Sequence, residues 1–163
     1  MGKDHVARIV EQWKKERPDL DPSPMAIIGR LSRLSRYIES ELETNFKEHG
    51  LQSGTFDLLA SLRRSGEPYT LTPTHLQKEM MLSSGATTHR IDLLEKQNLI
   101  ERLADPNDRR GTLVKLTQEG KNLIDEVIVT HLETETKLLS DLTPSQQKEL
   151  SKLLAKLAEH LDV

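Results

Sequence analysis

The spacing of apolar residues departs from the helical period in one stretch of the chain, and this stretch limits the possible folds more than any other feature. Over most of the sequence apolar residues recur every three or four positions, as in amphipathic helices. In the runs "LIERL" and "TLVKLT" the spacing falls to about two, which is typical of strands. These runs flank "ADPNDRRG", which is rich in turn-forming residues. The sequence therefore predicts one antiparallel hairpin in an otherwise helical chain.

The turn of this hairpin has recognisable chemistry. Pro106 suits a type I turn, Asn107 and Asp108 are turn formers, and Gly111 is predicted to adopt a positive φ. The loop is longer than a minimal hairpin turn. We therefore expect its tip to project from the domain.

Three helices are predicted in the first part of the chain. The first covers about residues 3–16 and is followed by the breaking segment "RPDLDPSP". Ser23 is predicted as a capping hydroxyl, with Pro24 in the first turn of a long amphipathic helix that ends near residue 50. A shorter helix, "SGTFDLLASLRR", follows.

Two short helices come directly before the hairpin. Thr72, followed by Pro73, caps the first, and serines begin the second, "LSSGATTHRIDLLEKQNL". Thr87, Ile91 and Leu94 share one face of the second helix and are assigned to the core. Two short helices with a tight connection form a helix-turn-helix.

Two further amphipathic helices follow the hairpin. Thr117 begins the first, and Thr143 with Gln146 forms a capping box ahead of the second. His131 lies on the apolar face of the first and is interpreted as a packing residue. The apolar stripes of the N-terminal and C-terminal helices each need a partner to bury them.

Composition agrees with one helix-rich domain. The chain has 163 residues, 30% of them charged and 3% aromatic, and no cysteine. It is long enough for one ordinary domain with an aliphatic core. The absence of cysteine fits a reducing compartment, and there is neither a signal peptide nor an apolar run of about 18 residues. We expect a soluble cytoplasmic protein without membrane contact.

Charge favours a local contact with nucleic acid. The net charge is −3, yet residues 83–117 carry a positive balance, 6 Lys and Arg against 5 Asp and Glu. A helix-turn-helix followed by a β-wing places its second helix in the major groove, and wing arginines reach phosphates or the minor groove. The DNA-contacting residues predicted on this basis are Ser83, Ser84, Thr88, His89, Arg109 and Arg110. The alternatives are solvated arginines on a surface hairpin, or a protein-interaction module without DNA affinity.

No enzyme site is predicted. The six histidines show no metal-binding spacing, and the chain has no G-x-S-x-G, P-loop or G-x-G-x-x-G motif. We therefore expect no catalytic residue, no metal and no cofactor.

The segments "IDLLEKQNLIER" and "DRRGTLVKLTQEG" resemble the recognition-helix and wing signature of MarR-family transcriptional regulators. The likeness spans essentially the whole chain. It implies a single MarR-type domain over residues 1–163, with an extra N-terminal helix at about 1–16. It also implies a winged helix-turn-helix at about 53–117 and an intertwined homodimer formed by about 24–50 and 118–163.

The N-terminal segment "EQWKKERPDLDPSPMAIIGRLSRLSRYIESELE" is similar to the urate-responsive, PecS-like branch of that family. In that branch a tryptophan, an aspartate and two arginines mark the ligand site, which implies Trp13, Asp57, Arg90 and Arg102 here. Arginines and an indole suit a flat anionic purine. Trp13 has an equally good interpretation as a packing anchor.

The resemblance thus implies a repressor that binds a palindromic promoter site as a homodimer and is released by a small anionic ligand such as urate. Related purines or phenolic anions could use the same arginines. The sequence does not identify the operator or the regulated genes.

Overall fold

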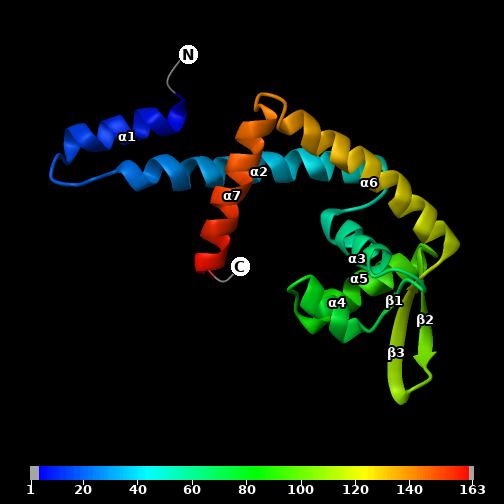
Figure 1. The fold of residues 1–163 in the computed structure, drawn as a ribbon. Coiled ribbons are helices and arrows are strands. Elements are labelled where there is room, and N and C mark those ends of the chain that lie inside the picture. The colour runs from blue at the N-terminus through cyan, green and yellow to red at the C-terminus, as the bar shows by residue number, and fades with distance from the viewer. Residues whose placement is uncertain (1–3, 162–163) are drawn as a thin grey trace. The chain divides into compact units, whose positions relative to one another are not determined.

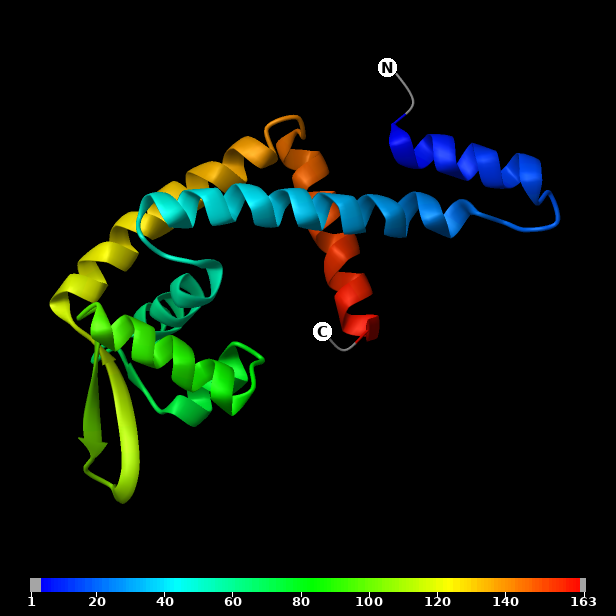
Figure 2. The same ribbon diagram turned by 180° about the vertical axis from the view of Figure 1, so that it is seen from behind.

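The structure is a computed structural model and describes residues 4–161. The described residues form two compact units, one ending at Glu41 and one beginning at Leu42. Figures 1 and 2 show the course of the chain in two opposite views. The elements, in chain order, are α1 (His5–Glu16), α2 (Ser23–Glu48), α3 (Ser53–Arg64), β1 (Thr70–Leu71), α4 (Pro73–Glu79), α5 (Ser84–Lys96), β2 (Ile100–Asp105), β3 (Asp108–Leu116), α6 (Gln118–Leu138) and α7 (Pro144–Leu161).

In the first unit α1 lies along the beginning of α2. Val6 and Val10 of α1 are buried, and a Cβ built on Gly29 of α2 would lie 3.1 Å from Cγ1 of Val6. Nε of Arg30 also pairs with Oδ2 of Asp4 at 2.8 Å. An apolar contact and the ion pair of Arg30 with Asp4 therefore help to hold the extra N-terminal helix.

The start of α2 differs from the prediction in one detail. Ser23 is the first helical residue, with Pro24 in the first turn. Its hydroxyl does not cap the helix: the carboxylate of Asp21 accepts both the Ser23 hydroxyl, at 2.8 Å, and the Ser23 N–H, at 3.0 Å. The aspartate therefore organises this turn, because an ionised carboxylate is the stronger acceptor.

The second unit contains the main core, which lies among α3, α4, α5, the sheet and α6. Thr87, Ile91 and Leu94 of α5 are buried as predicted. The ring of His131 stacks on Phe46, with centroids 5.6 Å apart, and lies tilted against Phe56, with centroids 4.8 Å apart, which confirms its packing role. The core side chains are Phe46, Leu51, Phe56, Leu58, Leu59, Leu62, Leu76, Ile91, Leu94, Ile100, Val114, Leu116, Ile124 and Val127.

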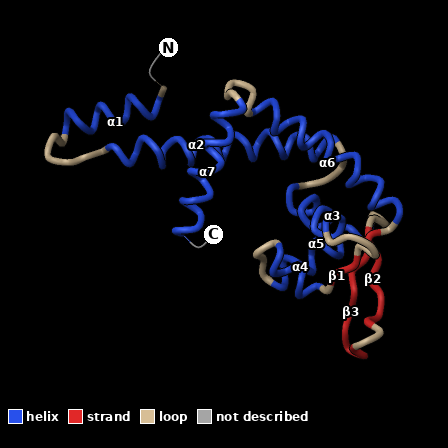
Figure 3. Tube along the Cα trace, viewed as in Figure 1, coloured by secondary structure: helices blue, strands red, loops and turns tan. Residues whose placement is uncertain are grey.

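The sheet has three antiparallel strands in the order β1-β3-β2 (Figure 3). The hairpin of β2 and β3 was predicted, whereas the two-residue strand β1 was not. Thr70 pairs with Lys115, and Leu71 pairs with Val114. β1 therefore fixes the base of the hairpin to the segment before α4.

At the hairpin tip two predictions were wrong: the long loop and the positive φ of Gly111. The strands pair as far as Asp105 and Asp108, so the turn contains only Pro106 and Asn107, and the register shifts between Ala104 and Asp105. Gly111 lies within β3 and does not adopt a positive φ. Space is the reason for a glycine there, because a Cβ would lie 2.8 Å from Cβ of Asp105 and 3.0 Å from Cβ of Asp108.

The predicted helix starts are otherwise confirmed by their hydrogen bonds. The side chains of Thr72, Ser83 and Thr117 accept backbone N–H groups at the starts of α4, α5 and α6. At α7 the N–H of Thr143 donates to Oε1 of Gln146, and the N–H of Gln146 donates to Oγ1 of Thr143.

Large apolar side chains stay exposed along α2, α6 and α7, and α7 buries none of its described side chains. They include Ile27, Ile28, Leu34, Val129, Leu132, Leu153, Leu154 and Leu161. Among residues 4–161 no helix is long and apolar enough to cross a membrane.

Candidate functional site

The N-terminal half of α5 presents a polar surface. Ser83, Ser84, Thr88 and His89 are exposed, whereas Thr87 between them is buried. Ser83 also serves as the N-cap, because its hydroxyl accepts the N–H of Ala86 at 3.3 Å. The predicted DNA-contacting residues of this helix therefore share one solvent-facing surface at its beginning.

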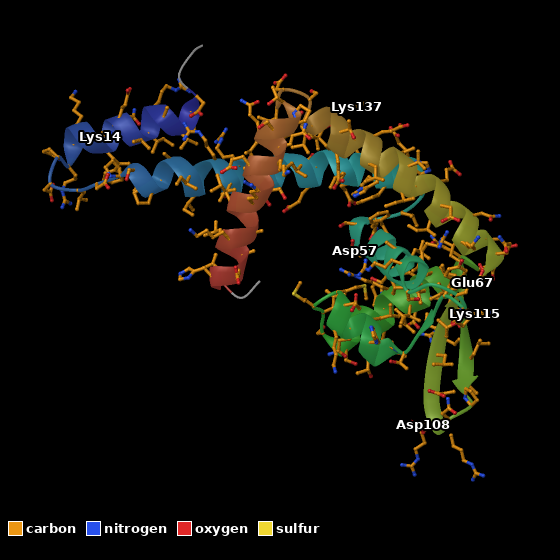
Figure 4. All side chains as sticks on the ribbon, in the orientation of Figure 1. Lys14, Asp57, Glu67, Asp108, Lys115 and Lys137 are labelled. Carbon is orange, nitrogen blue, oxygen red and sulfur yellow. The ribbon has the colours of Figure 1, made fainter. Side chains whose placement is uncertain are left out.

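Arg109 and Arg110 lie at the beginning of β3, after Asp108, and both are exposed. Asp108, labelled at the tip in Figure 4, accepts the backbone N–H of Arg110 at 2.9 Å. Asp105 accepts the N–H of Asn107 at the same distance. The two aspartates thus engage the backbone of the tip.

Arg102 of β2 connects the base of the hairpin to α5. Its Nη2 lies 2.5 Å from Oδ1 of Asp92, and its Nη1 donates to Oε2 of Glu95. Asp92 and Glu95 are three residues apart on α5 and share a face. The guanidinium assigned to ligand binding is therefore already paired with two carboxylates, and we call this arrangement the Arg102 clamp.

Arg90 of α5 lies against the first turn of α3. A Cβ built on Gly54 would meet Cζ, Nε and Nη2 of Arg90 at 2.3, 2.5 and 2.6 Å. The guanidinium therefore covers the position where any other residue would carry its side chain. The positive charge of Arg90 also acts on the carboxylate of Asp57, one turn further along α3 (Figure 4).

Asp57 has an unusual electrostatic environment for an aspartate. The residue is exposed overall, yet partial burial of its carboxyl raises its pKa, and the positive charges of Arg90 and then Arg64, followed by His131, oppose this rise. The structure therefore places two predicted ligand residues, Asp57 and Arg90, close enough for their charges to interact, without an ion pair between them. Arg102 is not among the charges that act on Asp57.

Trp13 belongs to the first unit, on α1. Its side chain is 45% exposed, so it is not a buried packing anchor within its own unit. Its role in ligand contact stays a prediction.

Sequence reasoning did not identify Gly54, Asp92 and Glu95. Asp92 and Glu95 lie three residues apart on α5, and Arg102 lies on the strand that follows. This pattern could have indicated the Arg102 clamp. Nothing local to Gly54 pointed to Arg90, which is 36 positions away. Among residues 4–161 no three potential metal-ligating side chains form a cluster.

A helix-turn-helix, an exposed polar start of its second helix and a hairpin with two exposed arginines together define a winged helix-turn-helix protein. Comparisons with known proteins agree. The model of the MarR family matches residues 51–112. The HTH-type transcriptional regulator PecS of Dickeya dadantii is 39% identical over 156 residues, which cover 96% of this chain and 94% of that protein.

Solved structures give the same answer. AbsC, a MarR family transcriptional regulator from Streptomyces coelicolor, matches with a TM-score of 0.78 and 26% identity over 88% of this chain and 97% of its own. Sco3205 from the same organism, solved in complex with DNA, matches with a TM-score of 0.75 and 25% identity over 86% and 89% of the two chains. The chain belongs to the MarR family and is a DNA-binding transcriptional regulator.

Proposed function

We propose that the protein is a ligand-responsive repressor that binds a palindromic promoter site as a homodimer. The beginning of α5 would enter the major groove, where the short side chains of Ser83, Ser84, Thr88 and His89 approach base edges and phosphates. Arg109 and Arg110 would contact phosphates or the minor groove from the wing. Such a regulator would act in the cytoplasm.

The exposed apolar stripes support the homodimer. Residues of about 24–50 and 118–163 carry most of them, and an amphipathic helix needs a partner for its apolar face. A two-fold dimer presents two recognition helices and two wings, which suits a palindromic site. In this proposal residues 1–163 act as a single MarR-type domain.

The approach of Arg90 to Asp57 carries the proposal of a ligand response. Arg90 sits on the helix that reads DNA, yet its guanidinium lies on α3 beside a carboxylate. A small anion such as urate would pair with this guanidinium, and its flat ring suits contact with arginine and with the indole of Trp13. Arg102 would supply a second cationic contact.

Release of DNA follows from where these groups are anchored. An anion that captures Arg90 is repelled by ionised Asp57, so binding favours a conformation in which α5 and α3 are displaced from each other. A ligand shifts such an equilibrium only by its differential affinity for the two conformations. A coupling of about 1–3 kcal/mol is typical of allosteric proteins and weakens operator binding roughly 5- to 150-fold.

The Arg102 clamp constrains the ligand. An anion that reaches Arg102 must compete with Asp92 and Glu95, so a ligand with several peripheral oxygens, such as urate, is favoured over one with a single anionic oxygen. Phenolic anions are the alternative class, and they would depend less on Arg102.

The test is an electrophoretic shift with a duplex that the protein itself selects from a randomised library. Urate is titrated into the complex, with hypoxanthine as a neutral purine control and with Arg90→Ala as the variant. We expect urate to release the wild-type protein, hypoxanthine to have little effect, and Arg90→Ala to bind DNA without responding to urate.

Three outcomes would contradict parts of the proposal. Failure to select or shift any duplex at low salt would remove DNA binding and favour a protein-interaction module. An unchanged complex at millimolar urate would remove urate as the ligand. A normal urate response of Arg90→Ala would remove Arg90 from the ligand site.

A further inference from the structure

Gly54 is the second residue of α3 and has an ordinary helical backbone, so an alanine could adopt its conformation without strain. Residue 54 is distinguished by its close contact with the side chain of Arg90. Three heavy atoms of the Arg90 guanidinium group occupy the space within 2.6 Å of the missing Cβ. Real Cβ atoms essentially never approach another heavy atom to less than 3.0 Å.

The guanidinium of Arg90 lies at the N-terminal end of α3, where the helix dipole disfavours a positive charge. The first turn of a helix carries a partial positive charge, which disfavours a cation beside it. The nearby carboxylate of Asp57 opposes this effect, because Arg90 is the strongest positive charge acting on it. The position of the guanidinium therefore depends on Asp57 and on the open space above Gly54, and any added atom at residue 54 removes that space.

We propose that Gly54 is a positioning residue for the ligand response: the absence of a side chain there seats the guanidinium of Arg90 on α3, beside Asp57. This inference rests on the proposed function, because it assigns the seated guanidinium as the state that an anion first engages, before α5 and α3 move apart. Gly54 itself contacts no ligand, and its effect passes entirely through Arg90.

Gly54→Ala tests this without removing any charge. The three heavy atoms nearest to the added methyl group all belong to the far end of the flexible Arg90 side chain. Arg90 can therefore swing away while the fold stays intact, and alanine has the higher helix propensity. Gly85→Ala is the matched control, because residue 85 is also a helical glycine and a Cβ there would meet nothing within 4 Å. Both variants should melt at or above the wild-type temperature.

The first measurement needs no ligand. The side-chain carboxyl of Asp57 is titrated by NMR in wild type, Gly54→Ala and Gly85→Ala. Because Arg90 lowers the pKa of Asp57, displacing its guanidinium should raise this pKa further in Gly54→Ala and leave it unchanged in Gly85→Ala. An unchanged titration in a folded Gly54→Ala variant would overturn the inference.

The second measurement is urate affinity by calorimetry without DNA. Loss of a charge-assisted hydrogen bond predicts that Gly54→Ala binds urate about 10-fold more weakly or worse. In the Arg90→Ala background Gly54→Ala should change neither urate affinity nor the Asp57 titration, because residues that act through one another are not additive. Equal effects of Gly54→Ala with and without Arg90 would overturn the inference.

The two measurements separate the possible failures. If urate fails to bind the wild-type protein, the proposed function is wrong in its ligand, and the Asp57 titration still decides whether Gly54 seats Arg90. If the Asp57 titration changes as expected while urate binds wild type and Gly54→Ala equally, Gly54 is not a positioning residue for the ligand response.

Discussion

Gly120 lies at the junction between α6 and the backbone that follows α5. A Cβ at this position would lie 1.9 Å from the carbonyl oxygen of Leu99 and 2.8 Å from its carbonyl carbon. The same oxygen accepts the N–H of Thr117 at 3.2 Å, and the Thr117 hydroxyl donates to the carbonyl of Asn98 at 2.7 Å. The obstacle is therefore backbone that is already held by the cap of α6, and it cannot rotate away.

These contacts determine the expected cost of Gly120→Ala. Alanine gains about 1 kcal/mol in helix propensity over glycine. Overpacking costs about 1–3 kcal/mol, and each of the two hydrogen bonds at the cap is worth about 1 kcal/mol if α6 moves away. The net result is a destabilisation of about 2 kcal/mol. For a chain of this size such a change lowers Tm by roughly 4–8 °C.

Thermal and urea unfolding of wild type, Gly120→Ala and Gly85→Ala at one protein concentration measure this effect. The concentration must be fixed because self-association contributes to apparent stability. We expect Gly120→Ala to be destabilised and Gly85→Ala to gain up to about 1 kcal/mol. A Gly120→Ala protein as stable as wild type would refute the close approach of α6 to Leu99.

Two other changes have defined outcomes. Because partial desolvation raises the pKa of Asp57, the stability contribution of its protonated form is lost as pH rises through that pKa. Asp57 is exposed overall, so the effect is small: Asp57→Asn should melt slightly higher than wild type at pH 7 and equally below about pH 3.8. A Tm difference that does not vary with pH would contradict this origin. Arg102→Gln should lower the free energy of unfolding by only about 1 kcal/mol, because Asp92 and Glu95 remain partly exposed. A decrease above about 3 kcal/mol in urea unfolding would show that the Arg102 clamp behaves as a buried pair.

Local chemistry explains which features could be predicted from the sequence. The caps at Thr72, Thr117 and Thr143 bond to groups within three residues, so their sequence pattern is sufficient. The order of two short helices and a hairpin gave the winged helix-turn-helix for the same reason. At Ser23 the prediction was wrong because Asp21, two residues earlier, supplies the stronger acceptor.

Features that depend on distant residues could not be predicted. Strand β1 has two residues, and its partners on β3 lie more than 40 positions away. It is too short to show a strand-like spacing of apolar residues. The prediction of a long loop at the wing tip was wrong because the strand pairing extends, through a register shift, to Asp108. Arg109 and Arg110 therefore lie in β3 and not in a loop. Asp57 and Arg90 were both predicted, whereas their dependence on Gly54 is visible only in three dimensions.

The central claim is that this fold binds DNA through its recognition helices and the arginines of its wing. It is tested most directly by the operator dissociation constant as a function of salt concentration. The proteins compared are wild type, Arg109→Ala with Arg110→Ala, and the charge-retaining Arg109→Lys with Arg110→Lys. We predict that the alanine variant binds all duplexes more weakly, with a log–log salt slope reduced by about 0.9 for each phosphate that an arginine no longer neutralises, and that the lysine variant keeps the wild-type slope. Equal slopes for wild type and the alanine variant would contradict the claim.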